Sequence, residues 1–141
     1  MKYLFVALLC FASVAQAVDN PDRPDHLGAF HERMTPYEQR IRAAQTTADM
    51  SQASTDMASA LDDELNTAYK RLMAELSPEQ QSALRTAQRH WLAYRDAEFA
   101  FLNDVFTRES HGTSVVLTVG GARNALVYER AEELWSYLQQ L

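Results

Sequence analysis

Cysteine is almost absent from this chain of 141 residues: the single one is Cys10, inside an apolar run near the N-terminus. Residues 18–141 therefore contain no thiol, which excludes a disulfide scaffold, a cysteine nucleophile and a Cys-x-x-Cys-His haem attachment there. The chain also lacks a Gly-x-Ser-x-Gly turn, a phosphate-binding loop and a His-Glu-x-x-His zinc motif. We therefore expect no enzyme, no cofactor and no catalytic residue.

Long apolar runs are confined to the N-terminus. Lys2, the apolar residues 3–14 and the small-x-small sequence Ala15-Gln16-Ala17 are typical of a secretory signal. We expect cleavage after Ala17 and a periplasmic or secreted protein; a retained N-terminal anchor is the alternative. The run is short for a transmembrane span and no later segment is longer, so no membrane contact is expected once the signal is removed.

Basic residues are the minority, since 13 Lys and Arg stand against 19 Asp and Glu and give a net charge of −6. Removal of residues 1–17 takes away Lys2 and lowers the net charge to −7. Such a chain is unsuited to nucleic acid or to anionic membranes, because both require basic faces. It permits a cationic protein partner, although a charge of this size also serves simply to keep a small domain soluble.

Residues 18–34 carry two prolines, a glycine and several charges without hydrophobic periodicity, which predicts a flexible leader. His26 and His31 fall in this segment, with Asp25 and Glu32 as neighbours. A metal site is the alternative, but flexible histidine pairs rarely bind a metal without further fixed ligands. We expect a solvated surface here and no metal ligand.

Residues 35–141 are predicted to form one helical domain, because no proline or glycine interrupts residues 37–77. Thr35 followed by Pro36 predicts the first helix start, and Thr46 with Asp49 predicts a restart. Ser77-Pro78, with Gln80 three residues after the cap, starts a further helix that runs to about residue 108. The connection at Ser77 is so short that the two helices it joins must form an antiparallel hairpin.

The last helix is predicted from about Ser114 to about Gln139, after a turn at Gly112. Residues 115–119 are β-branched and resemble a strand, but no second strand exists to pair with them. Gly120 and Gly121 weaken this helix and permit close packing or a kink. The fold class is therefore all-α, a small bundle of three to four helices with a long antiparallel hairpin.

An apolar stripe on the helix after Ser77 is expected to organise the core, formed by Leu84, Ala87, Trp91, Tyr94 and Leu102. Polar residues accompany it. We hypothesise that Arg95 or Arg130 pairs with Asp62 across the bundle while Asn66 and Gln88 complete the hydrogen bonds. Arg95→Ala should then destabilise far more than Arg85→Ala. The alternative is a polar pocket.

Three sequence segments resemble one known family: Asp62-x-Glu64-Leu65-Asn66-x-x-Tyr69, Leu84-Arg85-x-Ala87-Gln88-Arg89-x-Trp91-x-x-Tyr94-Arg95-Asp96-Ala97 and Arg130-x-x-Glu133-Leu134. Over about residues 44–138 the chain is similar to the lysozyme-inhibitor LprI-like N-terminal domain family of exported bacterial proteins. The resemblance implies a small helical domain in the cell envelope and, as activity, lysozyme inhibition. Members commonly carry cysteines, whereas this chain has Ala53 and Phe99 near two such places and none at 125–127.

The resulting function hypothesis is a helical binding protein that docks a cationic protein such as lysozyme. Candidate contact acids are Asp62, Asp63, Glu64, Glu132 and Glu133, although acids on helices also form ordinary solvated faces. The sequence Leu76-Ser77-Pro78-Glu79-Gln80 is also similar to the Leu-Thr-x-x-Gln signature of Spy/CpxP-type periplasmic stress chaperones. A chaperone, or a purely structural envelope protein, is therefore the alternative.

Overall fold

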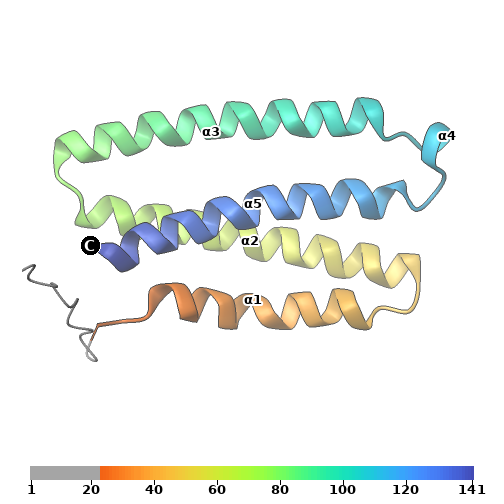
Figure 1. Ribbon diagram of the computed structural model, residues 1–141, viewed down its shortest axis with the longest axis horizontal. Coiled ribbons are helices and arrows are strands. Elements are labelled where there is room, and N and C mark those ends of the chain that lie inside the picture. The colour runs from red at the N-terminus through yellow and green to blue at the C-terminus, as the bar shows by residue number, and fades with distance from the viewer. Residues whose placement is uncertain (1–22) are drawn as a thin grey trace, which may run out of the picture.

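The computed structural model describes residues 23–141, and over these residues the chain forms five α-helices and no strand (Figure 1). They are α1 (His26–Ala43), α2 (Thr47–Glu75), α3 (Pro78–Val105), α4 (Arg108–His111) and α5 (Val115–Gln140). The all-α prediction is confirmed. The predicted signal and its cleavage site after Ala17 lie outside the described residues.

The first helix corrects two predictions, because residues 26–34 are helical instead of a flexible leader and no helix starts at Thr35. The helix begins at His26, where the Asp25 carboxylate accepts the Gly28 N–H at 2.7 Å, and Pro36 lies inside it. Phe30 and Met34 are fully buried, with 0% of their surface exposed. Their spacing places them on one helix face, and this burial outweighs the backbone hydrogen bond that proline cannot donate.

The predicted starts of α2 and α3 are confirmed. The Thr46 hydroxyl accepts the Asp49 N–H at 3.1 Å, and Ser77 and Gln80 form a reciprocal capping box. Only residues 76 and 77 separate the two helices, so they form the expected antiparallel hairpin (Figure 1). Short polar side chains satisfy the free N–H groups at these starts, which is why local sequence located them.

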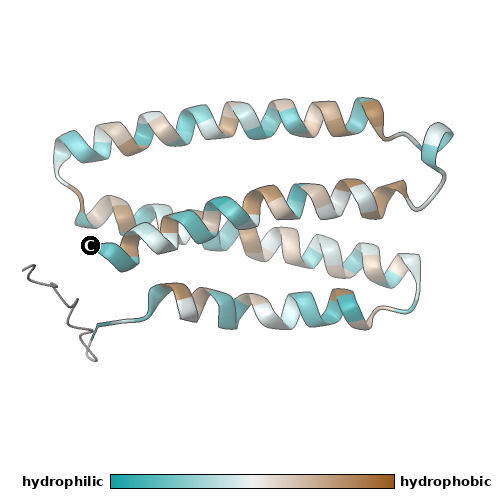
Figure 2. Ribbon diagram, viewed as in Figure 1, coloured by the Kyte–Doolittle hydropathy of each residue, from teal (hydrophilic) through white to brown (hydrophobic). Residues whose placement is uncertain are grey.

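The hydrophobic core lies between α1, α2 and α5. Its fully buried side chains include Phe30 and Met34 from α1, Leu61 from α2, and Leu134 from α5. Trp135 of α5 is also buried there, with 2% of its surface exposed. Hydrophobic and hydrophilic residues alternate along the long helices, as expected for amphipathic helices around one core (Figure 2).

Helices α2 and α5 approach each other closely at Gly120. A Cβ atom built on Gly120 would lie 3.0 Å from the Ser54 hydroxyl oxygen, whereas one on Gly121 would meet nothing within 4 Å. One turn further along, the buried Asn124 amide donates to the Ser54 carbonyl at 2.9 Å and to its hydroxyl at 3.1 Å. The prediction that a glycine allows close packing is confirmed at Gly120.

Helix α3 stands apart from the other helices (Figure 1), which corrects the expectation that its apolar stripe organises the core. Of the stripe, only Leu84 is buried, while Tyr94 is 52% exposed. Trp91 and Phe99 are partly buried against the core. The organising helices are therefore α2 and α5, and α3 is docked on them largely through long side chains.

The connection from α3 to α5 contains a helical turn that the sequence pattern did not reveal. Thr107 and Ser110 cap α4 reciprocally, and Gly112 follows it with a φ of 73°. The predicted turn at Gly112 is confirmed, since positive φ favours glycine. The β-branched residues 115–119 are helical, as predicted, although Ser114 makes no side-chain capping bond.

Candidate functional site

The family-motif residues of α2 and α3 meet at a groove between these helices. Its volume is about 570 Å³. From α2 it is lined by Asp62, Leu65, Asn66 and Tyr69, and from α3 by Ser82, Arg85, Gln88, Arg89, Leu92 and Arg95. Helical spacing explains the gathering, because residues three, four and seven apart share a helix face. The polar pocket that sequence left as the alternative is therefore present as an open groove.

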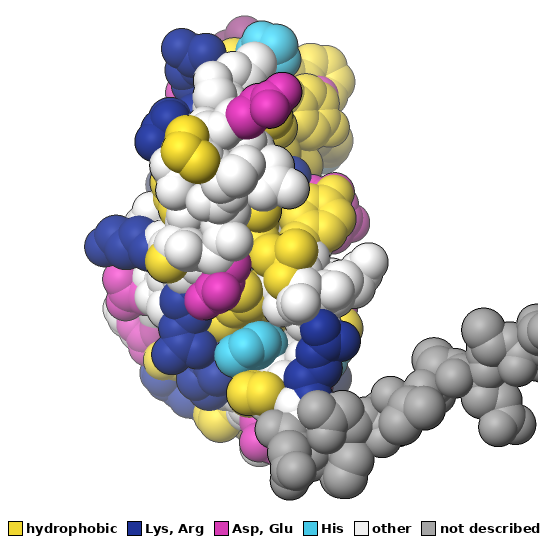
Figure 3. Space-filling view, turned by 90° about the vertical axis from the view of Figure 1, so that its left-hand side faces the viewer, with side chains coloured by type: hydrophobic (Ala, Val, Ile, Leu, Met, Phe, Trp, Pro, Cys, Tyr) yellow, Lys and Arg dark blue, Asp and Glu magenta, His cyan; other side chains and the backbone are white. Residues whose placement is uncertain are grey.

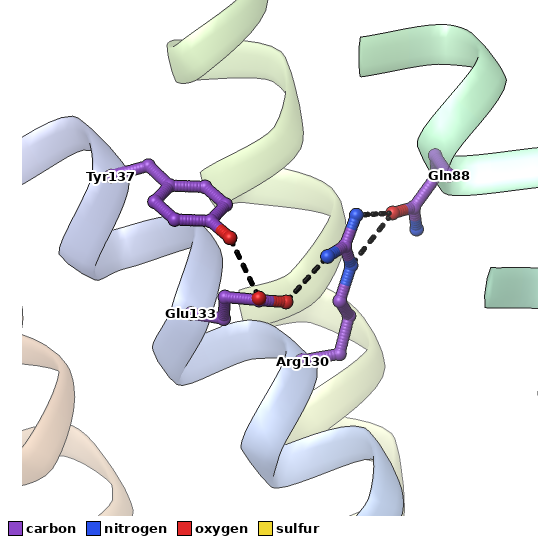
Figure 4. A network of polar contacts seen from close by, with 4 residues as sticks. All are labelled: Gln88, Arg130, Glu133 and Tyr137. Atoms are coloured by element: carbon purple, nitrogen blue, oxygen red, sulfur yellow. Dashed lines mark hydrogen bonds and ion pairs between the residues drawn. The ribbon is translucent and has the colours of Figure 1, made fainter.

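A second cluster crosses from α5 to α3 and is centred on Arg130, which is 8% exposed (Figure 4). The Arg130 Nε and Nη2 atoms donate to the Gln88 Oε1 atom at 3.1 and 3.0 Å. The Nη1 atom donates to Glu133, whose other carboxylate oxygen accepts the Tyr137 hydroxyl at 2.7 Å. The cluster therefore ties α3 to α5 by hydrogen bonds to a charged donor.

The predicted pairing of Asp62 with Arg95 or Arg130 is wrong. Arg130 bonds Gln88, as hypothesised, but its carboxylate partner is Glu133, one turn away on the same helix. Arg95 donates from Nε and Nη2 to its neighbour Asp96 at 2.9 and 2.7 Å. Asp62 and Asn66 are exposed on the α2 wall of the groove. Both arginines therefore have their carboxylate partners on their own helices.

Aromatic rings of α3 lie close to both arginines, within the same helix for Arg95 and across helices for Arg130 of α5. The Arg95 guanidinium lies 5.6 Å from the Trp91 ring centroid and 5.9 Å from that of Phe99. Arg130 lies 6.0 Å from Trp91, on the other side of the same cluster. Cation–π contacts of this kind add about 0.5–1 kcal/mol at exposed sites. The Arg95 contacts therefore lie within α3, whereas the Arg130 contact joins α5 to α3.

The Glu133 carboxyl and the Tyr137 hydroxyl influence each other's protonation. Burial alone raises the pKa of Glu133, but hydrogen bonds from Tyr137 and Arg130, together with the Arg130 charge, outweigh it and lower the pKa. The bond to Glu133, followed by burial, raises the pKa of Tyr137. Both shifts favour the charged carboxylate and the neutral phenol, the forms that make this hydrogen bond.

Besides Asp62, which lines the groove, the four acids predicted as partner contacts differ in their availability. Glu64 accepts Arg33 at 2.6 and 2.8 Å, and Glu132 accepts His31 at 2.6 Å. Glu133 is engaged by Arg130 and Tyr137. Asp63 is exposed and has no hydrogen bond or ion pair within residues 23–141. Of the four, Asp63 is the one whose carboxylate does not hold helices together.

Sequence reasoning missed a buried cluster around Trp135. Its indole N–H donates to the Glu64 carboxylate at 2.9 Å, and this side chain is only 14% exposed. The guanidinium groups of Arg33 and Arg71 lie 5.2 and 5.6 Å from the Trp135 ring centroid. The signal that could have found it was the spacing of Ala131, Trp135 and Leu138 on one face of α5. The cluster joins α1, α2 and α5.

The histidines of α1 serve the fold in the described structure. The His31 ring bonds Glu132, and the His26 ring stacks on Trp135 with centroids 6.1 Å apart. Within residues 23–141 no group of three His, Cys, Asp or Glu side chains is placed to hold a metal ion. Among the same residues no helix is long and apolar enough to cross a membrane.

The fold and these contacts define a small all-α domain in which polar side chains join the helices and line an open groove. The family model described as Lysozyme inhibitor LprI matches residues 39–134, which is more than half of the chain. The chain therefore belongs to the LprI lysozyme inhibitor family. No curated protein and no solved structure matches it.

Proposed function

We propose that this protein is exported to the cell envelope, where it binds a lysozyme and inhibits it. The observation that carries the proposal is the LprI family match over residues 39–134, which includes α2, α3 and most of α5. Because the family is one of inhibitors, we assign the protein a binding role and no reaction of its own. The proposed location follows from the sequence of residues 1–17.

The charge of the chain supports a cationic partner. The net charge of −6, or −7 after removal of residues 1–17, would attract a cationic lysozyme over long distances and raise the association rate. Such steering is screened within about 8 Å at physiological ionic strength. A specific complex must therefore add short-range contacts that persist when salt weakens the steering.

Asp63 is the acid that we propose as a direct contact. Its carboxylate is exposed on α2 and is not used to join helices. Glu64, Glu132 and Glu133 are poorer choices, because each is bonded to a group on the protein. Replacing any of these three would disturb helix contacts, whereas Asp63→Asn changes one charge and leaves the observed contacts intact.

The test is an inhibition assay with a c-type lysozyme on cell walls. Residues 18–141, which contain all five helices, are added in increasing amounts at low and moderate salt. We expect stoichiometric inhibition that survives moderate salt. Asp63→Asn should weaken it several-fold, while Glu109→Gln, an equal charge change on α4, should not. Inhibition seen only at low salt, or equal effects of both variants, would reduce the interaction to general charge attraction.

A chaperone role is the second candidate, and one observation favours it. Tyr94, Phe101 and Val105 are exposed large hydrophobic residues that share one face of α3. Exposed apolar surface of this kind is a feature of protein-binding surfaces. If the protein acts as a chaperone, it should suppress aggregation of a reduced client protein, and Phe101→Ser should remove that effect without changing lysozyme inhibition.

A further inference from the structure

The groove between α2 and α3 continues beyond the family-motif residues. A second hollow, of about 530 Å³, is lined by α2 and α3 together with α4 and the first half of α5. Asp62 lines both hollows. The two hollows therefore adjoin at Asp62, and together they are called the α2–α3 groove.

The lining of this groove has the opposite charge to the protein as a whole. Five arginines line it, namely Arg85, Arg89, Arg95, Arg108 and Arg123, against one carboxylate, that of Asp62. The whole chain has 13 basic and 19 acidic residues. Figure 3 views the end where α2 turns into α3; basic side chains lie mostly at the left of this view and hydrophobic ones mostly at the right. The groove is thus a concentrated positive region on an acidic protein.

Most of these arginines are available to a ligand. Arg95 pairs with Asp96, but no carboxylate of residues 23–141 lies within ion-pair distance of the other four. Arg85 and Arg89 donate only to neutral side chains on their own helix, at Gln81 and Thr86. A guanidinium has five donors in a planar fork, so these groups keep donors free for an anion.

Arg123 gives a second and independent indication. Its Nη2 atom donates to Asn103 at 2.7 Å, and its guanidinium carbon lies 4.8 Å from the centroid of the Phe99 ring. Its Nε atom is buried, yet it has no hydrogen-bond partner within the described residues. Of the Arg123 nitrogens only Nη2 has a hydrogen-bond acceptor within the described residues, so this guanidinium, which lines the second hollow, keeps donors for an anion.

The lining also specifies the class of anion. Arginine forks match carboxylates bidentately, while the amides of Asn66 and Gln88 and the hydroxyl of Ser82 suit hydroxyl-bearing ligands. The walls are helices, whose main-chain groups are already paired, so they offer no strand edge to the backbone of an extended peptide. A sugar chain needs no such edge.

We propose that the α2–α3 groove binds a carboxylate-bearing glycan chain. The choice of a glycan rests on the proposed function, because lysozymes act on glycans. Arg85 and Arg89 hold carboxylates at one end of the groove, and the Arg123 guanidinium binds an acceptor at the other. Asp62, between them, accepts hydroxyl groups of the sugar chain.

The test measures binding of residues 18–141 to oligogalacturonate by calorimetry at physiological salt, without lysozyme. We expect binding to the free acid and none to its fully methyl-esterified form. Arg85→Gln with Arg89→Gln should weaken binding about tenfold or more, as should Arg123→Gln. The double variant Arg42→Gln with Lys70→Gln is the matched control, because it removes the same charge away from the groove. Circular dichroism confirms that each variant is folded.

Several results would overturn the proposal. Equal binding of the esterified glycan would show that carboxylates are not recognised, and an equal loss in the control variant would show general charge attraction. Tighter binding of poly-L-glutamate would assign the groove to an acidic peptide instead. If the glycan does not bind while lysozyme is still inhibited, this inference alone is overturned. If the glycan binds while lysozyme is not inhibited, the lysozyme-directed function is overturned and the groove remains a glycan site.

Discussion

Replacement of Arg130 by alanine should be the most informative single change to the helix contacts. Arg130 is 8% exposed and donates three hydrogen bonds that join α5 to Gln88 on α3 and to Glu133. Each hydrogen bond to a charged group contributes about 1.5–3 kcal/mol when fully buried. Glu133, however, is 45% exposed and regains water when Arg130 is removed. The loss of stability is therefore smaller than the sum of three fully buried hydrogen bonds.

The expected loss is about 2–3 kcal/mol for Arg130→Ala, most of it from the Gln88 bonds and the packed side-chain stem. Arg130→Met keeps the stem and should cost about half as much. For a domain of this size, 2 kcal/mol lowers Tm by about 8 °C. Thermal unfolding followed by circular dichroism measures this, with chemical denaturation giving the free energy of unfolding.

The matched controls are Arg85→Ala and Arg95→Ala. Arg85 is exposed and bonds only Gln81, so its removal should change stability by less than about 0.5 kcal/mol. Arg95→Ala should cost about 1 kcal/mol, since Arg95 loses an exposed ion pair and contacts with Trp91 and Phe99. Arg130→Ala and Arg85→Ala melting within 1 °C of each other would refute the reasoning.

Three further predictions concern pH, glycine and the docking of α3. Because the folded pKa of Glu133 is lowered, the ionised carboxylate should stabilise the fold fully well above pH 4.5, the ordinary pKa, and this stabilisation should be lost as pH falls through the folded pKa. Glu133→Gln should flatten this part of the pH–stability curve. Gly121→Ala should raise the free energy of unfolding by about 0.5–1 kcal/mol, whereas Gly120→Ala should gain less because its Cβ meets Ser54; chemical denaturation compares them. Leu84→Ala should loosen the docking of α3 alone, which would appear as faster amide hydrogen exchange in that helix. Leu61→Ala should lower the free energy of unfolding by about 3–5 kcal/mol and affect all helices.

The helix starts were predictable because they depend on local chemistry. Thr46 and Ser77 bond N–H groups only three residues away, so the sequence contains the whole interaction. The start of α1 was not predictable in this way. Its proline and charges resemble a leader, and the helix forms because Phe30 and Met34 reach a core supplied by α2 and α5. The residues that form this core lie far from α1 in the sequence.

The candidate site was predictable in its membership but not in its pairing. The motif spacing correctly brought Asp62, Asn66, Gln88 and Arg95 to one region, and that region is a groove. Spacing along a helix shows which residues share a face, but it does not give the distance between two helices. Because α3 stands away from α2, Arg95 bonds Asp96 of its own helix instead of Asp62, and Arg130 of α5 bonds Gln88 and Glu133.

Side-chain contacts, in place of a disulfide, hold α3 against the other helices. Phe99, near a place where the family resemblance puts a cysteine, packs against the core under the Arg123 guanidinium, and Asn103 binds the same group. Arg123 and Arg130 of α5 thus contact α3, and the presence of Arg123 along the groove has a structural cause. Arg95 pairs with Asp96 and with aromatic rings of α3, whereas Arg85 and Arg89 donate only to neutral side chains of that helix. Their position in the groove is the feature that docking leaves unexplained, and they are therefore the residues whose replacement separates a binding groove from a gap between helices.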